Sequence, residues 1–382
     1  MRLFSLSFFA AFLLVAGCQT QPIKSFKDGG EVTEISPYEK RLWLQSKRFD
    51  KAIYKQNSIY QDDEATQYLQ DIMDSLFPEF QGKIRVKIVK TPVLNAFALP
   101  NGSVYIHLGM LARFDNEAQL ATLLGHEGAH FIHKHGYKQR ENIKTSSAFA
   151  MGLAIAGVPV IGNVIAMSSI SGFSQEHERE SDKVAYQRVL QKGYDTRETS
   201  KGFEYLLAEV KALDIESPYF FSTHPKLQDR IDTFNDLNAK NGNKGGIVNK
   251  EVYDAKMKKI RTDCLKSDIQ LNRYKSVILV LEKQGAIEKY GSTAHYYLGE
   301  AYRLRAEKGD LEKAGKEYQK VIQKQPGFAA GYKAMGLYHM KSSQHEQALE
   351  YFNEYLRMAN DQGDAGYVKG YIEQIKKLAG QS

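Results

Sequence analysis

The segment Leu123–His135 places the strongest constraint on how this chain can fold. It reads LLGHEGAHFIHKH, with the apolar spacing of a helix, and its His126, Glu127 and His130 form an HExxH pattern. Residues four apart share one face of a helix, so both imidazoles can bind one ion at about 2.0–2.1 Å. Glu127 is rotated by about 100° from His126, which lets it reach a water molecule at that ion without binding the ion itself.

The other two histidines of this segment, His133 and His135, do not complete that site. His133 lies on the same face as His126 but seven residues further along the helix, at an axial distance of about 10 Å. The metzincin extension of the motif requires glycine at position 133 and histidine at position 136, and this chain has His133 and Gly136 instead. We expect His133 and His135 to pack or to donate hydrogen bonds, and the third ligand to come from elsewhere.

An acidic segment about fifty residues downstream offers that third ligand. Residues 175–182 read QEHERESD, and Glu178 and Asp182 lie four apart on one helical face, with Glu180 pointing away. This spacing allows one carboxylate to bind zinc while the other orients a ligand imidazole. Taken alone, such a pair more often marks a solvated helix face. The HExxH helix upstream is what favours the metal site.

These motifs resemble those of peptidase family forty-eight, the Oma1-like and HtpX-like group of zinc metallopeptidases, over roughly residues 37 to 235. The matching segments are NAFALPNG at 95–102, HEGAH at 126–130, ERESD at 178–182, STHP at 222–225, and Arg230 with Ile231. Two departures, Ser181 in place of alanine and Gln175 in place of arginine, remove no ligand and affect only local packing.

The resemblance implies a role for each matching residue. It implies one Zn²⁺ per chain, bound by His126, His130 and Glu178, with Glu127 as the general base and Asp182 as the partner of a ligand imidazole. It also implies that His224 lies beside the metal. There His224 would stabilise the developing oxyanion, or occupy the open zinc position at rest and keep the enzyme latent, or be only a loop residue.

The N-terminus resembles a bacterial lipoprotein signal. Arg2 precedes an apolar stretch at 3–16 that is too short to span a bilayer, and the small residues before Cys18 fit a lipobox. We therefore expect a signal peptide at 1–17 and lipid attachment at Cys18, with an ordinary signal peptide as the alternative. Gln19 favours the outer membrane. Because Cys18 would carry lipid, we expect no disulfide within the chain.

Alternation and turn residues predict a small β-region before the HExxH helix. We expect helices over 37–77 with a break at 60–63, then strands at 83–90, 96–99 and 103–108. Asn95, Ala96, Phe97 and Ala98 are interpreted as an edge strand on which an extended substrate pairs. The alternative is an ordinary hairpin strand. The apolar stretch at 148–170 is broken at Pro159, so two short helices are favoured over a membrane span.

The C-terminal third reads as paired helices with a repeat. Gly299 and Gly336 begin two similar units 37 residues apart, near the repeat length of about 34 in tetratricopeptide arrays. Small residues at these positions allow the paired helices to approach closely. An unrelated helical bundle is the alternative. The lipobox and this tail make the chain similar to the periplasmic BepA-like branch of the family.

The predicted fold class is therefore α+β and predominantly helical. We expect a tether at 18–36, a zincin-type metallopeptidase domain at 37–240 and a tetratricopeptide-like domain at 265–380. The formal charge of +7 is modest, and without a Lys/Arg-rich run no nucleic-acid partner is expected.

Three functions fit this organisation. The first is a membrane-tethered zinc endopeptidase of the cell envelope, which cleaves misfolded or stalled proteins recruited by the repeats. The partners implied are protein substrates and the outer-membrane protein assembly machinery. The second is a chaperone or scaffold in which proteolysis is secondary. The third is hydrolysis of small peptides or cell-wall cross-links.

Overall fold

The computed structural model describes residues 25–26, 36–143, 173–213, 224, 227–283, 285–359, 363–378 and 380. Four expectations lie outside these residues: the signal peptide at 1–17, lipidation of Cys18, most of the tether, and the two short helices within 148–170. None of the helices that the structure does describe is long and apolar enough to cross a membrane.

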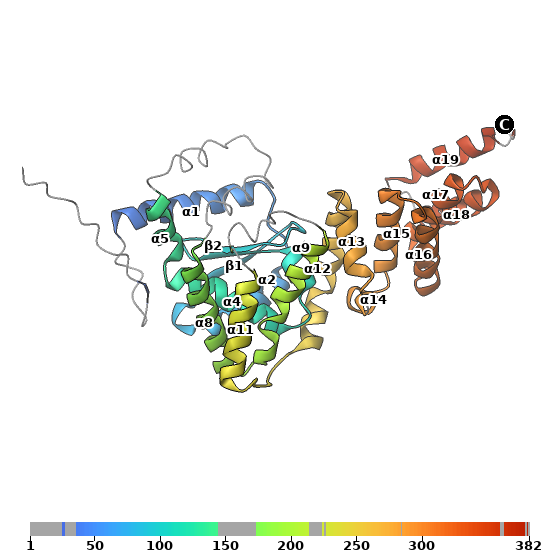
Figure 1. The fold of residues 1–382 in the computed structure, drawn as a ribbon. Helices are drawn as coiled ribbons and strands as arrows, with labels where there is room; N and C mark the ends of the chain where they lie inside the picture. Colours follow the sequence, from blue (N-terminus) through green and yellow to red (C-terminus); the bar gives the residue numbers. More distant parts are fainter. Residues whose placement is uncertain are drawn as a thin grey trace, which may run out of the picture.

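The described chain is predominantly helical, with one small sheet (Figure 1). The N-terminal helices are α1 (Pro37–Lys55), α2 (Asp63–Leu76), α3 (Leu108–Arg113), α4 (Glu117–Ile132), α5 (His135–Ile143), α8 (Gln175–Gln191), α9 (Lys201–Ala212) and α11 (Leu227–Asn241). The C-terminal helices are α12 (Lys250–Gln270), α13 (Tyr274–Leu281), α14 (Ala286–Tyr290), α15 (Ala294–Arg305), α16 (Asp310–Lys324), α17 (Ala329–Lys341), α18 (His345–Met358) and α19 (Ala365–Leu378).

The three predicted strands are present and form one sheet. They are β1 (Arg85–Val89), β2 (Ala96–Ala98) and β3 (Ser103–His107), in the spatial order β1-β3-β2. β1 pairs parallel to β3, and β2 pairs antiparallel to it through the predicted tight turn. Gly102 in that turn has a φ of 82°, a left-handed conformation that favours glycine. β2 is therefore an edge strand of the described sheet.

The first predicted helix ends earlier than the sequence pattern suggests. α1 stops at Lys55, and Asn57 adopts a left-handed conformation. The chain then runs extended, because Ile59 bridges to Val89 of β1 and the Tyr60 N–H donates to the Ile88 carbonyl at 2.9 Å. Pairing with the sheet thus overrides the helical pattern of these residues.

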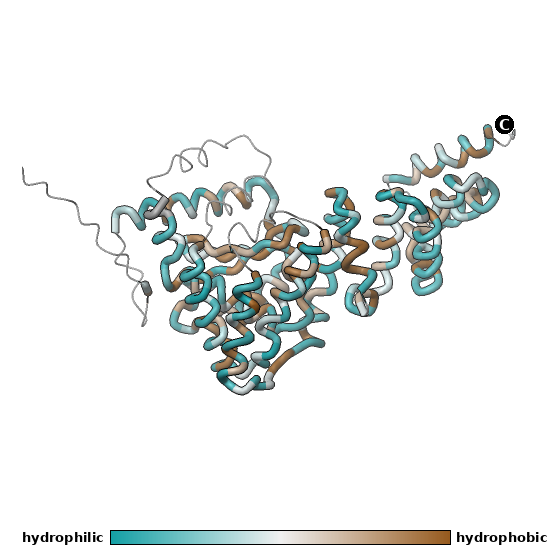
Figure 2. Tube along the Cα trace, viewed as in Figure 1, coloured by the Kyte–Doolittle hydropathy of each residue, from teal (hydrophilic) through white to brown (hydrophobic). Residues whose placement is uncertain are grey.

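Helices cover the sheet on both faces, with α1 on one side and α2, α4, α8 and α11 on the opposite side (Figure 1). Ile53 of α1 packs with Phe97 and Tyr105 on the first face, and Val104 and Ile106 join the main core on the second. The strands are largely hydrophobic, whereas the helices alternate between hydrophilic and hydrophobic residues (Figure 2). This is the pattern of amphipathic helices packed on a buried sheet.

Close packing of α4 against α8 depends on Gly125. A Cβ atom at this position would lie only 3.1 Å from the Cα of Ala185. We expect Gly125→Val to destabilise the protein by about 1–3 kcal/mol through overpacking, measured as a lower urea midpoint. Gly370→Ala in α19 is the matched control, since no neighbour lies within 4 Å of a Cβ there. Equal midpoints for Gly125→Val and the wild type would contradict this packing argument.

The C-terminal helices continue the core of the N-terminal part. The Tyr253 hydroxyl of α12 donates to the Leu111 carbonyl at 2.7 Å, and Tyr253 and Leu265 belong to the same hydrophobic cluster as the strands. The predicted domain start at residue 265 falls inside α12. Cys264 is buried and free. Within the described residues, the hydrophobic core therefore runs on from the N-terminal strands and helices into α12.

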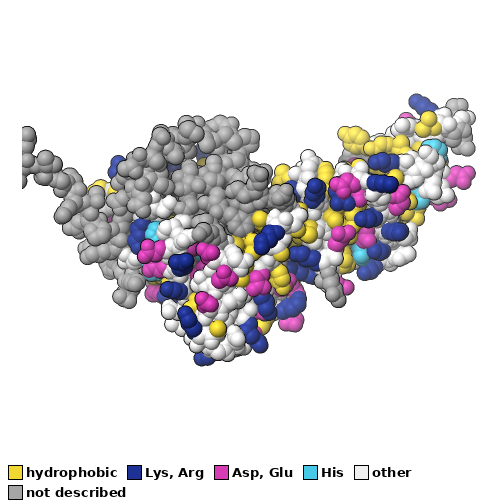
Figure 3. Space-filling model, in the orientation of Figure 1, with side chains coloured by type: hydrophobic (Ala, Val, Ile, Leu, Met, Phe, Trp, Pro, Cys, Tyr) yellow, Lys and Arg dark blue, Asp and Glu magenta, His cyan; other side chains and the backbone are white. Residues whose placement is uncertain are grey.

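The predicted close approaches of paired helices are present in the C-terminal part. A Cβ atom at Gly299 of α15 would lie 2.4 Å from the ring of Tyr318 on α16, and one at Gly336 of α17 would lie 2.4 Å from the ring of Phe352 on α18. Basic and acidic side chains are interspersed over these helices on the face drawn in Figure 3. The assignment of these helices as tetratricopeptide repeats stays a prediction.

Candidate metal centre

The HExxH motif lies on α4, a helix that is buried along its whole length. Its N-terminus is capped by Asn116, whose side chain accepts a hydrogen bond from the Gln119 N–H at 3.1 Å. Burial of both faces is possible because the sheet and α2 cover one side and α8 covers the other. The helix therefore holds its polar motif residues inside the protein, away from bulk water.

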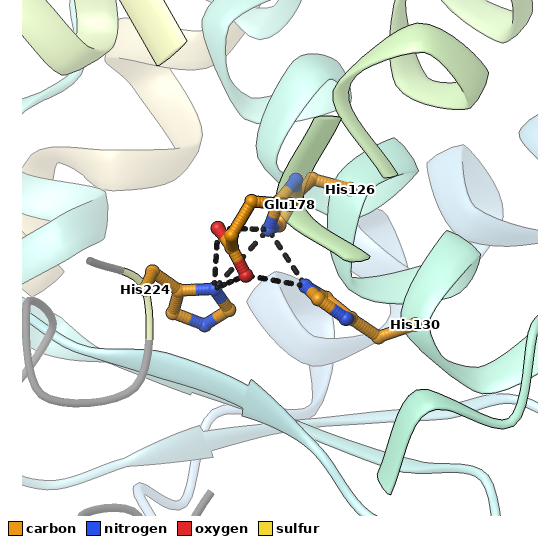
Figure 4. A group of neighbouring side chains, drawn as sticks. All are labelled: His126, His130, Glu178 and His224. Carbon is orange, nitrogen blue, oxygen red and sulfur yellow. Dashed lines mark hydrogen bonds and ion pairs between the residues drawn. The ribbon is translucent and has the colours of Figure 1, made fainter. Parts of the chain in front are cut away.

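Four side chains from three segments converge on one point (Figure 4). The Nε2 atoms of His126 and His130 are 2.9 Å apart, and Glu178 of α8 reaches both, with its Oε1 3.3 Å from the Nε2 of His130. The Nδ1 of His224 lies 3.2 Å from the Nε2 of His126 and 3.1 Å from Glu178 Oε1. All four ligand atoms lie within 4.8 Å of one another.

This donor set fits a zinc ion. Two imidazoles and one carboxylate are the protein ligands of many catalytic zinc sites. Burial lowers the pKa of both His126 and His130 well below the usual value, so each imidazole is neutral and keeps a lone pair for a metal. Burial opposes the charge of Glu178, but the neighbouring His224 outweighs it and holds the pKa of that carboxyl well below its usual range.

Asp182 lies behind His126, as its position one turn after Glu178 suggests. Its Oδ1 is 2.8 Å from the Nδ1 of His126, the nitrogen that does not face the other ligands. Burial raises the pKa of Asp182 to about 6, although Arg230 of α11 works against this by donating to both carboxylate oxygens. The pair Asp182–Arg230 therefore fixes the orientation of the His126 ring.

Glu127 is completely buried beside the four converging side chains. Its Oε1 lies 3.4 Å from the Nε2 of His224. Burial raises the pKa of the Glu127 carboxyl to about 7, and the Ala98 backbone amide of β2 is among the groups that lower it. A buried carboxyl whose pKa is raised to about 7 suits a general base.

The edge strand β2 runs beside this carboxylate. The Leu99 N–H donates to Ser103 and Asn95 accepts from His107, so these two residues direct their backbone groups towards β3. The backbone groups of Ala96 and Ala98 therefore point to the free side of the strand. Phe97 stacks on Tyr105 with ring centroids 5.1 Å apart, which anchors the strand.

Several neighbours of the site were not identified from the sequence. Arg230 appeared only as part of a matching motif, and its contact with Asp182 joins residues 48 positions apart. Phe173 stacks on the ring of His130 with centroids 3.9 Å apart. The Nδ1 of His130 lies 3.0 Å from the Nδ1 of His135. No spacing rule signals these contacts, because they depend on the tertiary packing of α4, α8 and α11.

Residues 61–238 match the model of peptidase family M48. The chain therefore contains a peptidase family M48 domain, and this domain is that of a metalloprotease. Peptidases of this family depend on zinc, and the buried group around His130 could hold a metal ion.

Three relatives illustrate the similarity. The Beta-barrel assembly-enhancing protease of Escherichia coli is 26% identical over 157 residues, which cover 38% of this chain and 32% of that protein. The Mitochondrial metalloendopeptidase OMA1 of Arabidopsis thaliana is 30% identical over 125 residues, 32% of this chain and 25% of that protein. Its namesake in Schizosaccharomyces pombe is 27% identical over 153 residues, 39% of this chain and 45% of that protein. The chain thus spans less than half the length of each relative.

Proposed function

We propose that this protein is a zinc-dependent endopeptidase of the bacterial cell envelope that cleaves misfolded or stalled envelope proteins. The observation that carries the proposal is the convergence of His126, His130 and Glu178 next to the buried Glu127. The test is cleavage of casein by the purified chain, its loss on removal of zinc with a chelator, and its return on adding Zn²⁺. Cleavage unchanged by the chelator would contradict the proposal.

The mechanism assigns one task to each side chain. A bound Zn²⁺ would act as a Lewis acid and lower the pKa of a water molecule. Glu127, with its raised pKa, accepts the proton of the attacking water and passes it to the leaving amine. Asp182 and Arg230 keep the His126 ring in place, so the ligand geometry does not have to be rebuilt in each cycle.

The free edge of β2 is the proposed substrate platform. An extended segment that pairs with the backbone groups of Ala96 and Ala98 would lengthen the sheet and pass beside Glu127. Such pairing uses main-chain groups of the substrate and therefore accepts many sequences, but only where the substrate is unfolded. This property suits the removal of misfolded proteins.

The location and partners of the protein are proposed from the sequence and from its relatives. The lipobox at Cys18 supports attachment to the periplasmic side of the outer membrane through lipid. The name of the Escherichia coli relative supports a partner in the assembly of β-barrel proteins. We propose that α15–α18 act as tetratricopeptide-like repeats that recruit these substrates. The close contacts at Gly299 and Gly336 support this assignment.

The position of His224 favours one of its three expected roles. Its Nδ1 stands among the three proposed zinc ligands, where it would fill the place that a water molecule or substrate needs. We therefore propose that His224 holds the enzyme latent at rest. We expect His224→Ala to raise kcat/KM on a short peptide. A fall of roughly 10²- to 10³-fold would instead assign His224 to oxyanion stabilisation and contradict the latent arrangement.

A further inference from the structure

A second group of potential metal ligands lies where α4 ends and α5 begins. His133 caps the C-terminus of α4, His135 is the first residue of α5, and Glu180 of α8 reaches both. The Nδ1 of His133 is 3.0 Å from Glu180 Oε1, and the Nε2 of His135 is 3.0 Å from Glu180 Oε2. One ligand atom from each residue lies within 4.8 Å of the other two.

We propose that His133, His135 and Glu180 form a second site for a divalent metal ion of the zinc type. Ligand atoms around a tetrahedral zinc are about 3.4 Å apart, so the observed contacts of 3.0 Å need only a small opening. Two imidazoles and one carboxylate suit Zn²⁺, Cu²⁺, Ni²⁺ or Co²⁺, whereas Mg²⁺ and Ca²⁺ prefer oxygen ligands alone. The site lies outside the machinery assigned to peptide cleavage.

The three ligands are held in place and still accessible. The rings of His133 and His135 are nearly parallel, at 16°, and His177 stacks on the ring of His135 at 4.2 Å. Both ligand histidines are buried, but the Glu180 side chain is 39% exposed. His133 and Glu180 line a cavity of about 970 Å³ that opens to solvent. An ion has a path of entry there, and a water molecule has room to complete its coordination.

His135 also connects this site to the first one. A neutral imidazole carries one proton, so His130 bound to zinc through Nε2 keeps its proton on Nδ1 and donates it to His135 Nδ1, 3.0 Å away. His135 then carries its own proton on Nε2, facing Glu180. A metal on that Nε2 requires the proton on Nδ1, where Ser181 Oγ can accept it at 3.3 Å.

Filling the second site therefore removes the hydrogen-bond acceptor of His130. Outer-sphere partners of this kind typically change metal affinity by roughly 10- to 100-fold. Binding of the second ion should therefore weaken binding of the first. An excess of metal should lower the occupancy of the first site. This coupling rests on the proposed catalytic zinc site, whereas the second site itself does not.

Titration of the metal-free full chain with Co²⁺, followed by visible absorption and calorimetry, tests the site. We expect two ions per wild-type chain, and one in Glu180→Gln and in His133→Gln, neither of which alters the contact of His135 with His130. Glu176→Gln, an exposed acid on the same helix, is the matched control and should bind two. A single ion in the wild type, or two ions in Glu180→Gln, would overturn the proposal.

A second variant separates this proposal from the proposed function. The double variant Glu178→Ala with His224→Ala leaves only the two imidazoles of α4 at the first site, so an ion that it holds tightly occupies the second. Retention of no ion in this double variant, with one ion in Glu180→Gln, would overturn the second site while leaving the first intact. For the coupling, we expect the first ion to bind at least roughly tenfold more weakly when the second is present. Equal affinities of the first site for its ion, with and without the second ion, would exclude the coupling.

Discussion

Glu127→Gln is expected to abolish peptide cleavage while leaving zinc bound and the fold intact. The amide has the size of the carboxylate but cannot accept a proton, and general-base catalysis typically contributes roughly 10²- to 10⁴-fold. Because Glu127 is not a proposed ligand, about one zinc per chain should remain at the first site. The measurement is kcat/KM on a fluorogenic peptide, with zinc determined by mass spectrometry on the same sample.

The same variant distinguishes the endopeptidase from a scaffold. If the chain acts mainly as a chaperone, assembly of outer-membrane proteins should proceed normally in cells that express Glu127→Gln. If proteolysis is the main function, stalled proteins should accumulate. Glu176→Gln serves as the control, since this side chain is exposed on α8 and is not one of the converging groups. Full peptide cleavage by Glu127→Gln would contradict the proposed mechanism.

Glu178→Ala is expected to have an even larger effect, because it removes a ligand rather than a proton acceptor. The imidazoles of His126, His130 and His224 hold zinc more weakly without the carboxylate, so the occupancy of the first site should drop and cleavage should fall below that of Glu127→Gln. A folded protein that binds zinc is stabilised by that binding, so the zinc-dependent rise in melting temperature should become smaller.

The control for this loss is again Glu176→Gln, two residues earlier on the same helix. It should keep its zinc, its activity and its zinc-dependent stability. A Glu178→Ala variant that retains zinc at the first site and cleaves peptides would exclude Glu178 as a ligand. His224, the remaining member of the converging group, would then be the candidate for the third ligand.

Much of the local structure could be predicted from the sequence. The 3.6-residue period of a helix brings His126 and His130 to one face whatever the rest of the chain does. The same period explains why Glu178 and Asp182 lie on one face of α8 and why Glu180 is directed elsewhere. The alternation of residues 83–90 predicted β1, and proline with glycine predicted the turn between β2 and β3.

What could not be predicted depends on contacts between distant segments. Arg230 meets Asp182 only because α11 packs on α8, and Phe173 covers His130 only because the chain turns into α8 at that point. Glu180 was expected to point away, but no pattern showed that it would meet His133 and His135. The early end of α1 likewise follows from pairing between Ile59 and Val89 across thirty residues of sequence.

The most direct test is anomalous diffraction at the zinc absorption edge from crystals of the zinc-loaded full-length protein. The account predicts a peak within bonding distance, about 2.0–2.2 Å, of the imidazole nitrogens of His126 and His130 and a carboxylate oxygen of Glu178. A peak that lacks any one of these three ligands, or zinc held only at other residues, would contradict it.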